Sequence, residues 1–173
     1  MSPALMRPWS VRRLTEGERR LGVETFGDEV DVERVRLWAP PIPRMFGPRP
    51  FVAGNLVRPG RDLIVWTRAP ADFTHPDVSL YVRSVFIHEM THVWQSQRGV
   101  NLLFAKLRAG DRAASYEYVL ETGSAWPAFN IEQQAMIVQH DYLRRCGGQC
   151  PYPAEAYQAV LPFRSRAERP FQA

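Results

Sequence analysis

The chain has 173 residues, which favours one domain of ordinary size, and its hydrophobic fraction of 45% suffices for a core. Its charged fraction of 23% is typical of folded chains. The chain has no apolar run of about 18 residues, so we expect no membrane-spanning helix. The net charge is +4, but the arginines are scattered, so we expect a solvated surface and no nucleic-acid or membrane partner. The N-terminus lacks an apolar signal segment, which predicts a cytoplasmic protein or one exported without a signal peptide through a secretion machine.

The first half of the chain predicts one helix and a small set of strands. Residues 1–10 read as a loose end. A helix is expected over residues 15–26, because Thr15 can cap it and Glu18 completes a capping box. Residues 39–50 are rich in proline and predict a loop. Alternating apolar residues predict strands at 32–38, 51–57 and 62–67, the last two forming a hairpin around residues 58–61.

The second half predicts mainly helices. Asn130 and Gln133 form a capping box for one of them, and Gly147 follows its end. The tail, residues 146–173, is expected to be coil. The predicted helices cover residues 78–97, 101–108 (one or two turns) and 131–145, with an extended stretch at 116–119.

One segment, residues 86–95, contains the motif His-Glu-x-x-His. His88 and His92 are four apart, so on a helix they lie on one face and both imidazoles can bind one ion. Imidazole nitrogens suit Zn²⁺, which takes four ligands. Glu89 is turned by about 100° from His88, so it can act as general base on a metal-bound water instead of binding the metal. The motif therefore predicts a zinc site with Glu89 as the catalytic residue.

The alternative interpretation is a pair of ordinary histidines on a core or surface helix, since so short a motif also occurs by chance. On a helical wheel, however, both histidines lie opposite the apolar residues, so we expect them to face a cleft or solvent. A functional site explains this pattern better than packing does. The apolar arc consists of Phe86, Ile87, Met90, Val93 and Trp94.

A zinc site needs a third protein ligand. Gln95 and Arg98 stand where metzincins have a glycine and a third histidine, so that class is excluded. A carboxylate on a downstream helix is another common solution. We prefer Glu132, because Ala135 and Gln139 share its helical face and leave room and polarity near the ion. The alternative is that Glu132 is only a favourable acidic residue at a helix N-terminus. The other downstream candidates are Glu117, Glu121 and Asp141.

Two further residue types bear on the site. Tyr116 and Tyr118 are candidate donors to an oxyanion, with aromatic packing as the alternative role. Cys146 and Cys150 form either a disulfide or a pair of free thiols, and a second metal site that adds His140 is the weaker alternative. We expect the two thiols not to touch the catalytic metal.

The chain resembles the bacterial Vgr-related, or Rhs-element Vgr, protein family over about residues 14–142, and it is similar to the metallopeptidase domain of contractile injection systems. The resemblance implies a gluzincin-like fold and a link to type VI or related secretion clusters. The resembling stretches are Thr-Glu-Gly-Glu-Arg (15–19), Phe-Gly-Asp-Glu-Val-Asp (26–31), Val-Arg-Leu (35–37), His-Glu-Met-Thr-His-Val-Trp-Gln (88–95) and Asn-Ile-Glu-Gln-Gln-Ala (130–135).

These observations predict one compact, zincin-like α+β domain over residues 1–173, with its core over about residues 14–145. A small sheet should pack on an active-site helix and a second, ligand-bearing helix. The first functional hypothesis is a zinc metallopeptidase that acts on a peptide or protein. The second is a non-catalytic zinc-binding structural or adaptor protein of a type VI or contractile injection cluster. A nucleic-acid-associated zinc protein is a third, weaker hypothesis.

Overall fold

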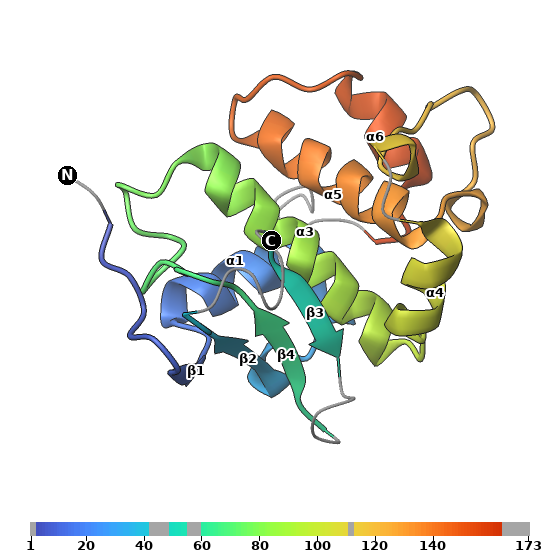
Figure 1. Cartoon of the computed structure of the whole chain (residues 1–173). Helices are drawn as coiled ribbons and strands as arrows, with labels where there is room; N and C mark the ends of the chain where they lie inside the picture. The colour runs from blue at the N-terminus through green and yellow to red at the C-terminus, as the bar shows by residue number, and fades with distance from the viewer. Residues whose placement is uncertain (1–2, 42–48, 55–59, 111–112, 164–173) are drawn as a thin grey trace.

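The computed structural model describes residues 3–41, 49–54, 60–110 and 113–163. They form a compact α+β structure with a four-stranded sheet and five helices, as the sequence predicts (Figure 1). The helices are α1 (Glu16–Phe26), α3 (Leu80–Gln97), α4 (Leu102–Ala109), α5 (Ile131–Arg145) and α6 (Ala154–Val160). Within the described residues, no helix is both long and apolar enough to cross a membrane.

The sheet is mixed and has the strand order β1-β2-β4-β3. The central strands β2 and β4 run parallel, whereas β1 and β3 pair antiparallel at the edges. The β3–β4 pairing agrees with the predicted hairpin, although part of its turn lies outside the described residues. The strands are β1 (Val11–Arg13), β2 (Val35–Trp38), β3 (Phe51–Gly54) and β4 (Asp62–Val65).

The N-terminal part of the chain is more ordered than its sequence predicts. Residues 1–10 were expected to be a loose end, but the Met6 amide donates to the Ala69 carbonyl at 2.8 Å and the Met6 side chain is buried. The predicted strand at 32–38 is also shorter, because Asp31 caps a 3-10 turn at Val32–Arg34 and β2 begins only at Val35. The first correction depends on a contact between residues far apart in the chain, and the second depends on a side-chain cap. Hydrophobic periodicity contains no information about either.

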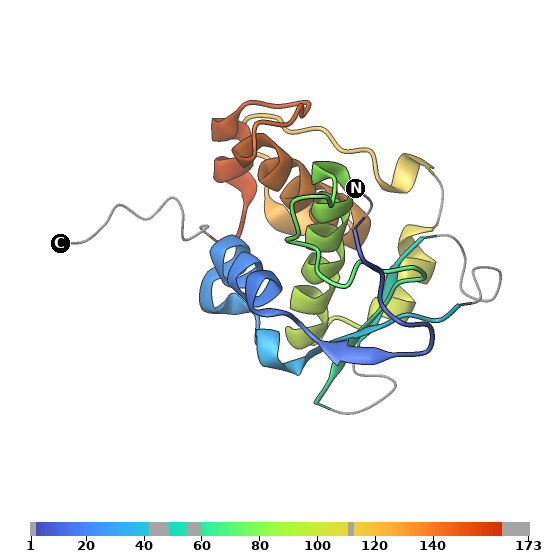
Figure 2. The same ribbon diagram turned by 90° about the vertical axis from the view of Figure 1, so that its left-hand side faces the viewer.

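Helix α3 lies between two layers, with the sheet on one side and α5 on the other (Figures 1 and 2). Its apolar residues, among them Phe86 and Met90, join Leu37 and Ile64 of the sheet in the main core. The opposite face is covered by α5. The histidines were expected to face a cleft or solvent, but they do not face open solvent: His88 and His92 are only 7% and 6% exposed, because α5 packs over them.

The tail beyond α5 contains a helix where coil was expected. Pro153 precedes α6, and Tyr157 and Val160 turn inward to pack on Ile137 of α5. Tyr157 is fully buried. The helix is too short for its periodicity to stand out in the sequence, and its stability depends on this tertiary contact.

We predict that Tyr157→Ala lowers the free energy of unfolding by about 3–5 kcal/mol, because it removes a fully buried aromatic ring from the contact between α5 and α6. Tyr157→Phe is the matched control and should cost about 1 kcal/mol, since it removes only the hydroxyl. Urea unfolding measures both. Equal stability of the alanine variant and the parent would contradict the packing of α6.

Candidate metal centre

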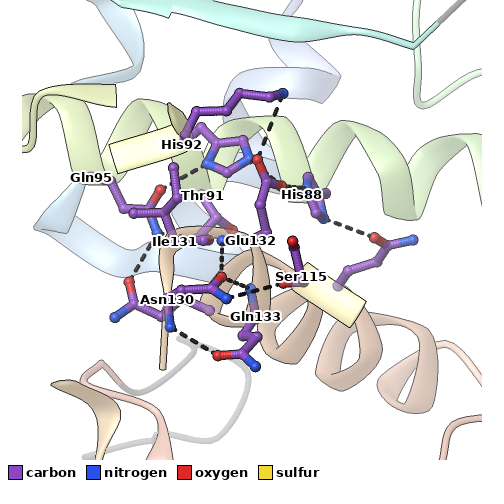
Figure 3. A network of polar contacts seen from close by, with 12 residues as sticks. His88, Thr91, His92, Gln95, Ser115, Asn130, Ile131, Glu132 and Gln133 are labelled. Carbon is purple, nitrogen blue, oxygen red and sulfur yellow. Dashed lines mark hydrogen bonds and ion pairs between the residues drawn. The ribbon is translucent and has the colours of Figure 1, made fainter. Parts of the chain in front are cut away.

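His88 and His92 of α3 and Glu132 of α5 meet in the interior between the two helices (Figure 3). The Nε2 atoms of both histidines lie 3.2 Å from the same oxygen, Oε2 of Glu132. One ligand-type atom from each residue lies within 4.8 Å of the other two. The Glu132 side chain is buried as deeply as the imidazoles, with 1% of the residue exposed. The structure therefore brings together the three residues that the sequence singles out as metal ligands.

The position of Glu132 depends on the cap of α5. Asn130 Oδ1 accepts hydrogen bonds from the backbone amides of Glu132 and Gln133, both at 2.9 Å. The Gln133 side chain in turn accepts from the Asn130 amide at 2.9 Å, which confirms the predicted capping box. Asn130 also donates to the Ser115 carbonyl. The cap thus holds the first turn, and with it Glu132, against α3.

The outer nitrogen of His92 is bonded to Gln95. Gln95 Oε1 lies 2.8 Å from His92 Nδ1, while Gln95 Nε2 donates to the Ile131 carbonyl at 3.1 Å. A carbonyl oxygen can only accept, so the amide NH₂ must face Ile131 and the amide oxygen must face the imidazole. It follows that His92 Nδ1 carries a hydrogen and donates it.

His88 is held in the same way by Gln139 of α5. Gln139 Oε1 lies 3.1 Å from His88 Nδ1, and Gln139 Nε2 lies 3.1 Å from Ser84 Oγ. The Ser84 hydroxyl donates its own hydrogen to the Tyr81 carbonyl, so it accepts from Gln139. The amide oxygen of Gln139 therefore faces His88, and His88 Nδ1 is also a donor.

These two hydrogen-bond chains leave the Nε2 atoms as the inner atoms of the rings. In neutral imidazoles with a hydrogen on Nδ1, each Nε2 directs a lone pair at the carboxylate of Glu132. A positive charge, either a metal ion or a proton on Nε2, would offset the repulsion between such atoms. A tetrahedral zinc ion with bonds of about 2.0–2.1 Å would hold neighbouring ligand atoms roughly 3.3 Å apart. The observed separations of 3.2 Å fit that geometry, and two imidazoles with one carboxylate are a donor set that suits zinc.

Glu132 and His92 influence each other's ionisation. Burial opposes the ionisation of Glu132, but hydrogen bonds from His88 and His92 outweigh it and hold the pKa of Glu132 well below its ordinary value. Burial likewise opposes the charging of His92, yet its hydrogen bond to Glu132 and the nearby carboxylates raise the pKa of His92. The carboxylate thus attracts positive charge, whether a proton or a metal ion.

Glu89 lies beside this group without joining it. The side chain is 4% exposed, and its Oε2 atom has no hydrogen-bond partner among the described residues. Burial raises the pKa of Glu89 above its ordinary value. A buried carboxyl with an unused oxygen is suited to accept and hold a proton.

The other residues considered from the sequence have different positions. The ring of Tyr116 stacks near His88, with centroids 6.3 Å apart. Tyr118 instead bonds His140 Nδ1 through its hydroxyl at 2.6 Å and packs with Tyr157. Of the two tyrosines, Tyr116 is the one with a ring contact to a proposed ligand.

The competing carboxylates lie apart from this group. Glu117 and Glu121 are exposed. Asp141 is buried, but it pairs with Arg144 at 3.2 Å and Arg145 at 2.9 Å. Glu132 is thus the downstream acid that the structure brings to the histidines.

Cys146 and Cys150 are free thiols in this structure. Cys150 Sγ donates to the Tyr152 carbonyl, and His140 uses its Nδ1 atom on Tyr118. Among the residues that the structure describes, the grouping that could hold a metal ion is that of His88, His92 and Glu132. The second metal site considered from the sequence is therefore not formed by the described side chains.

Gln95 and Lys106 were not assigned a role at the site from the sequence, and Gln139 was expected only to leave polarity near the ion. Gln95 and Gln139 bond the outer nitrogens of the histidines, and Lys106 of α4 places Nζ 3.7 Å from Glu132 Oε1. Gln95 stands three residues after His92 and Gln139 seven after Glu132, spacings that lie on the ligand-bearing faces of the helices. That signal is present in the sequence, but only the pairing of α3 with α5 distinguishes these amides from other polar residues on those faces.

Comparison with known proteins shows which protein family the chain is related to. No family model matches it. It is 37% identical over 139 residues to the type VI secretion system spike protein VgrG2b of Pseudomonas aeruginosa, a match that covers 78% of this chain and 13% of that protein. The solved effector domain of Pseudomonas aeruginosa VgrG2b superposes with a TM-score of 0.63 and 32% identity, covering 86% of this chain and 80% of that chain. The chain therefore belongs to the Vgr-related family that includes the effector domain of VgrG2b.

Proposed function

We propose that this chain is a zinc metallopeptidase domain of the zincin type, which hydrolyses peptide bonds in a peptide or protein substrate and is delivered by a type VI secretion system. The observation that carries the proposal is the convergence of His88 Nε2 and His92 Nε2 on one oxygen of Glu132, with both Nδ1 hydrogens engaged elsewhere. The link to type VI secretion rests on the name of the relative VgrG2b.

In this proposal His88, His92 and Glu132 would hold the zinc ion. A bound zinc ion would supply Lewis-acid activation and lower the pKa of a water molecule toward about 7. Glu89 would take the proton of the attacking water and pass it to the leaving amine, a role supported by its burial and raised pKa. Tyr116, which stacks beside His88, is the candidate donor to the oxyanion.

One observation favours a second function, that of a non-catalytic zinc-binding structural or adaptor domain. The three proposed ligands are all buried and come from two packed helices, so an ion between them would join α3 to α5. Structural zinc sites stabilise small domains in this way. The two functions differ in their requirement for Glu89, because a structural site has no use for a general base.

We predict that Glu132→Ala lowers zinc affinity by orders of magnitude, because it removes the carboxylate that both histidines face. Glu121→Ala is the matched control and should retain one zinc per chain, since Glu121 is exposed. Metal analysis after dialysis against a weak chelator measures both. If both variants retain equal zinc, Glu132 is not a ligand.

We predict that Gln95→Leu and Gln139→Leu each weaken zinc binding about 10- to 100-fold, because each removes the acceptor that keeps a hydrogen on Nδ1 of its histidine. Gln149→Leu is the control, since Gln149 is exposed. Competition with a chromogenic chelator gives the affinities. An unchanged affinity in both variants would show that the amides do not orient the imidazoles.

We predict that Glu89→Gln binds one zinc and melts at or slightly above the temperature of the parent, because the amide keeps the shape of the carboxyl and has no charged form for burial to disfavour. Peptide hydrolysis should fall by about 100- to 10,000-fold, the usual contribution of a general base. By contrast, His88→Ala should lose metal and activity together. The assay uses zinc-loaded protein and a broad peptide library, with and without chelator. If the parent cleaves no peptide and Glu89→Gln matches it in every cellular assay, the structural or adaptor function is favoured.

A further inference from the structure

A cavity of about 840 Å³ lies at the end of α5 remote from the metal centre. Residues of α1 form one wall, and the C-terminal turn of α5 forms another, with contributions from α3 and α6. Tyr142 lines it and follows Glu132 by ten residues, which is about 15 Å along a helix. The residues that form the metal centre do not line this cavity, and its volume is that of a small-molecule site.

The lining of the cavity is rich in arginine. Arg20 of α1, Arg83 of α3, and Arg144 and Arg145 of α5 all contribute to its wall. Glu24 is the acidic residue in the lining, and Asp141 lies behind the wall, paired with the two arginines of α5. Among the described residues, the wall of the cavity therefore carries more guanidinium groups than carboxylates.

Three of the four guanidinium groups are held in place by the protein. Arg145 Nε donates to Asp141 Oδ2 at 2.9 Å, and Arg144 Nη2 donates to Asp141 Oδ1 at 3.2 Å. Arg83 donates from Nε to the Phe73 carbonyl at 3.3 Å and from Nη2 to the Val78 carbonyl at 3.2 Å. Arginine has five N–H donors, so among the described residues these bonds position Arg83 and Arg145 without using all of their donors. Such preorganisation lowers the entropy cost of binding a ligand.

We infer that this cavity binds a small organic phosphate with at least two negative charges, such as a nucleoside diphosphate. Guanidinium forks bind phosphate oxygens in pairs, and guanidinium groups from α1, α3 and α5 surround one cavity here. The buried ring of Tyr142 packs beside Arg145, with its centroid 5.8 Å from the guanidinium carbon, and so helps to position that group. The cavity volume of about 840 Å³ leaves room for the organic part of the ligand. This inference does not depend on the proposed metallopeptidase activity.

The test is isothermal titration of the full chain with ADP, pyrophosphate and inorganic phosphate at constant ionic strength. We expect saturable binding of ADP or pyrophosphate. Arg20→Gln and Arg83→Gln should each weaken it roughly tenfold or more, the usual effect of losing one charge-assisted hydrogen bond. Arg61→Gln is the control, because Arg61 is exposed and does not line the cavity. Arg145→Lys keeps the charge but loses the fork, and should weaken binding while the chain stays folded.

The probes also distinguish the ligand sources. Tighter binding of ADP than of pyrophosphate would support a nucleotide, and equal binding would support a site for the phosphate groups alone. Absence of saturable binding for all three probes would overturn the inference, as would equal affinities in the Arg20, Arg83 and Arg61 variants. Binding of an acidic peptide with none of the phosphates would also overturn it.

Discussion

The contact of His88 and His92 with one carboxylate oxygen of Glu132 is the interaction on which the arrangement of α3 and α5 depends. It places three ionisable side chains in the interior, where an unpaired charge would cost several kcal/mol. The three groups offset one another only while α5 lies against α3 and the Asn130 cap holds the first turn of α5. The packing of the two helices and the geometry of the site therefore require each other.

Two amide side chains decide the chemical state of this group. A glutamine can present either an oxygen or an NH₂ group to a histidine, and the choice here is made by the Ile131 carbonyl and the Ser84 hydroxyl. Both are neighbours supplied by the packed helices, not by the motif itself. The hydrogen on each Nδ1 atom thus follows from the positions of groups outside the His-Glu-x-x-His segment.

Helix α5 has opposite charge at its two ends. Its first turn carries Glu132 and its last turn carries Arg144 and Arg145, the distribution that complements the helix dipole. The residue types that stabilise the two ends of this helix are therefore the same ones that the proposed binding roles require at those ends. At one end the carboxylate faces the histidines, and at the other the arginines face the cavity beside α1. A single helix thereby supplies charged side chains to two separate places in the fold.

Much of this architecture could be predicted from local patterns. Apolar periodicity and capping residues are local properties, so the helices that begin after Thr15 and Asn130 and the helix that carries the motif were all predictable. The motif spacing likewise determines that His88 and His92 share one helical face. Glu132 could also be chosen from the sequence among the four downstream acidic residues, because it alone lies in the first turn of a capped helix with polar neighbours on the same helical face.

Other features depended on contacts between distant residues. Burial of the histidines requires α5 on the face that the helical wheel leaves open, and a wheel contains no information about neighbouring helices. The short helix α6 exists because Tyr157 packs on Ile137, and β1 exists because β2 offers it a partner. The sequence by itself determined the local elements and the candidate ligands, because caps and periodicity act over a few residues. Only the tertiary structure decided which polar groups face the imidazoles and which arginines gather around the cavity, because those groups come from helices that are far apart in the chain.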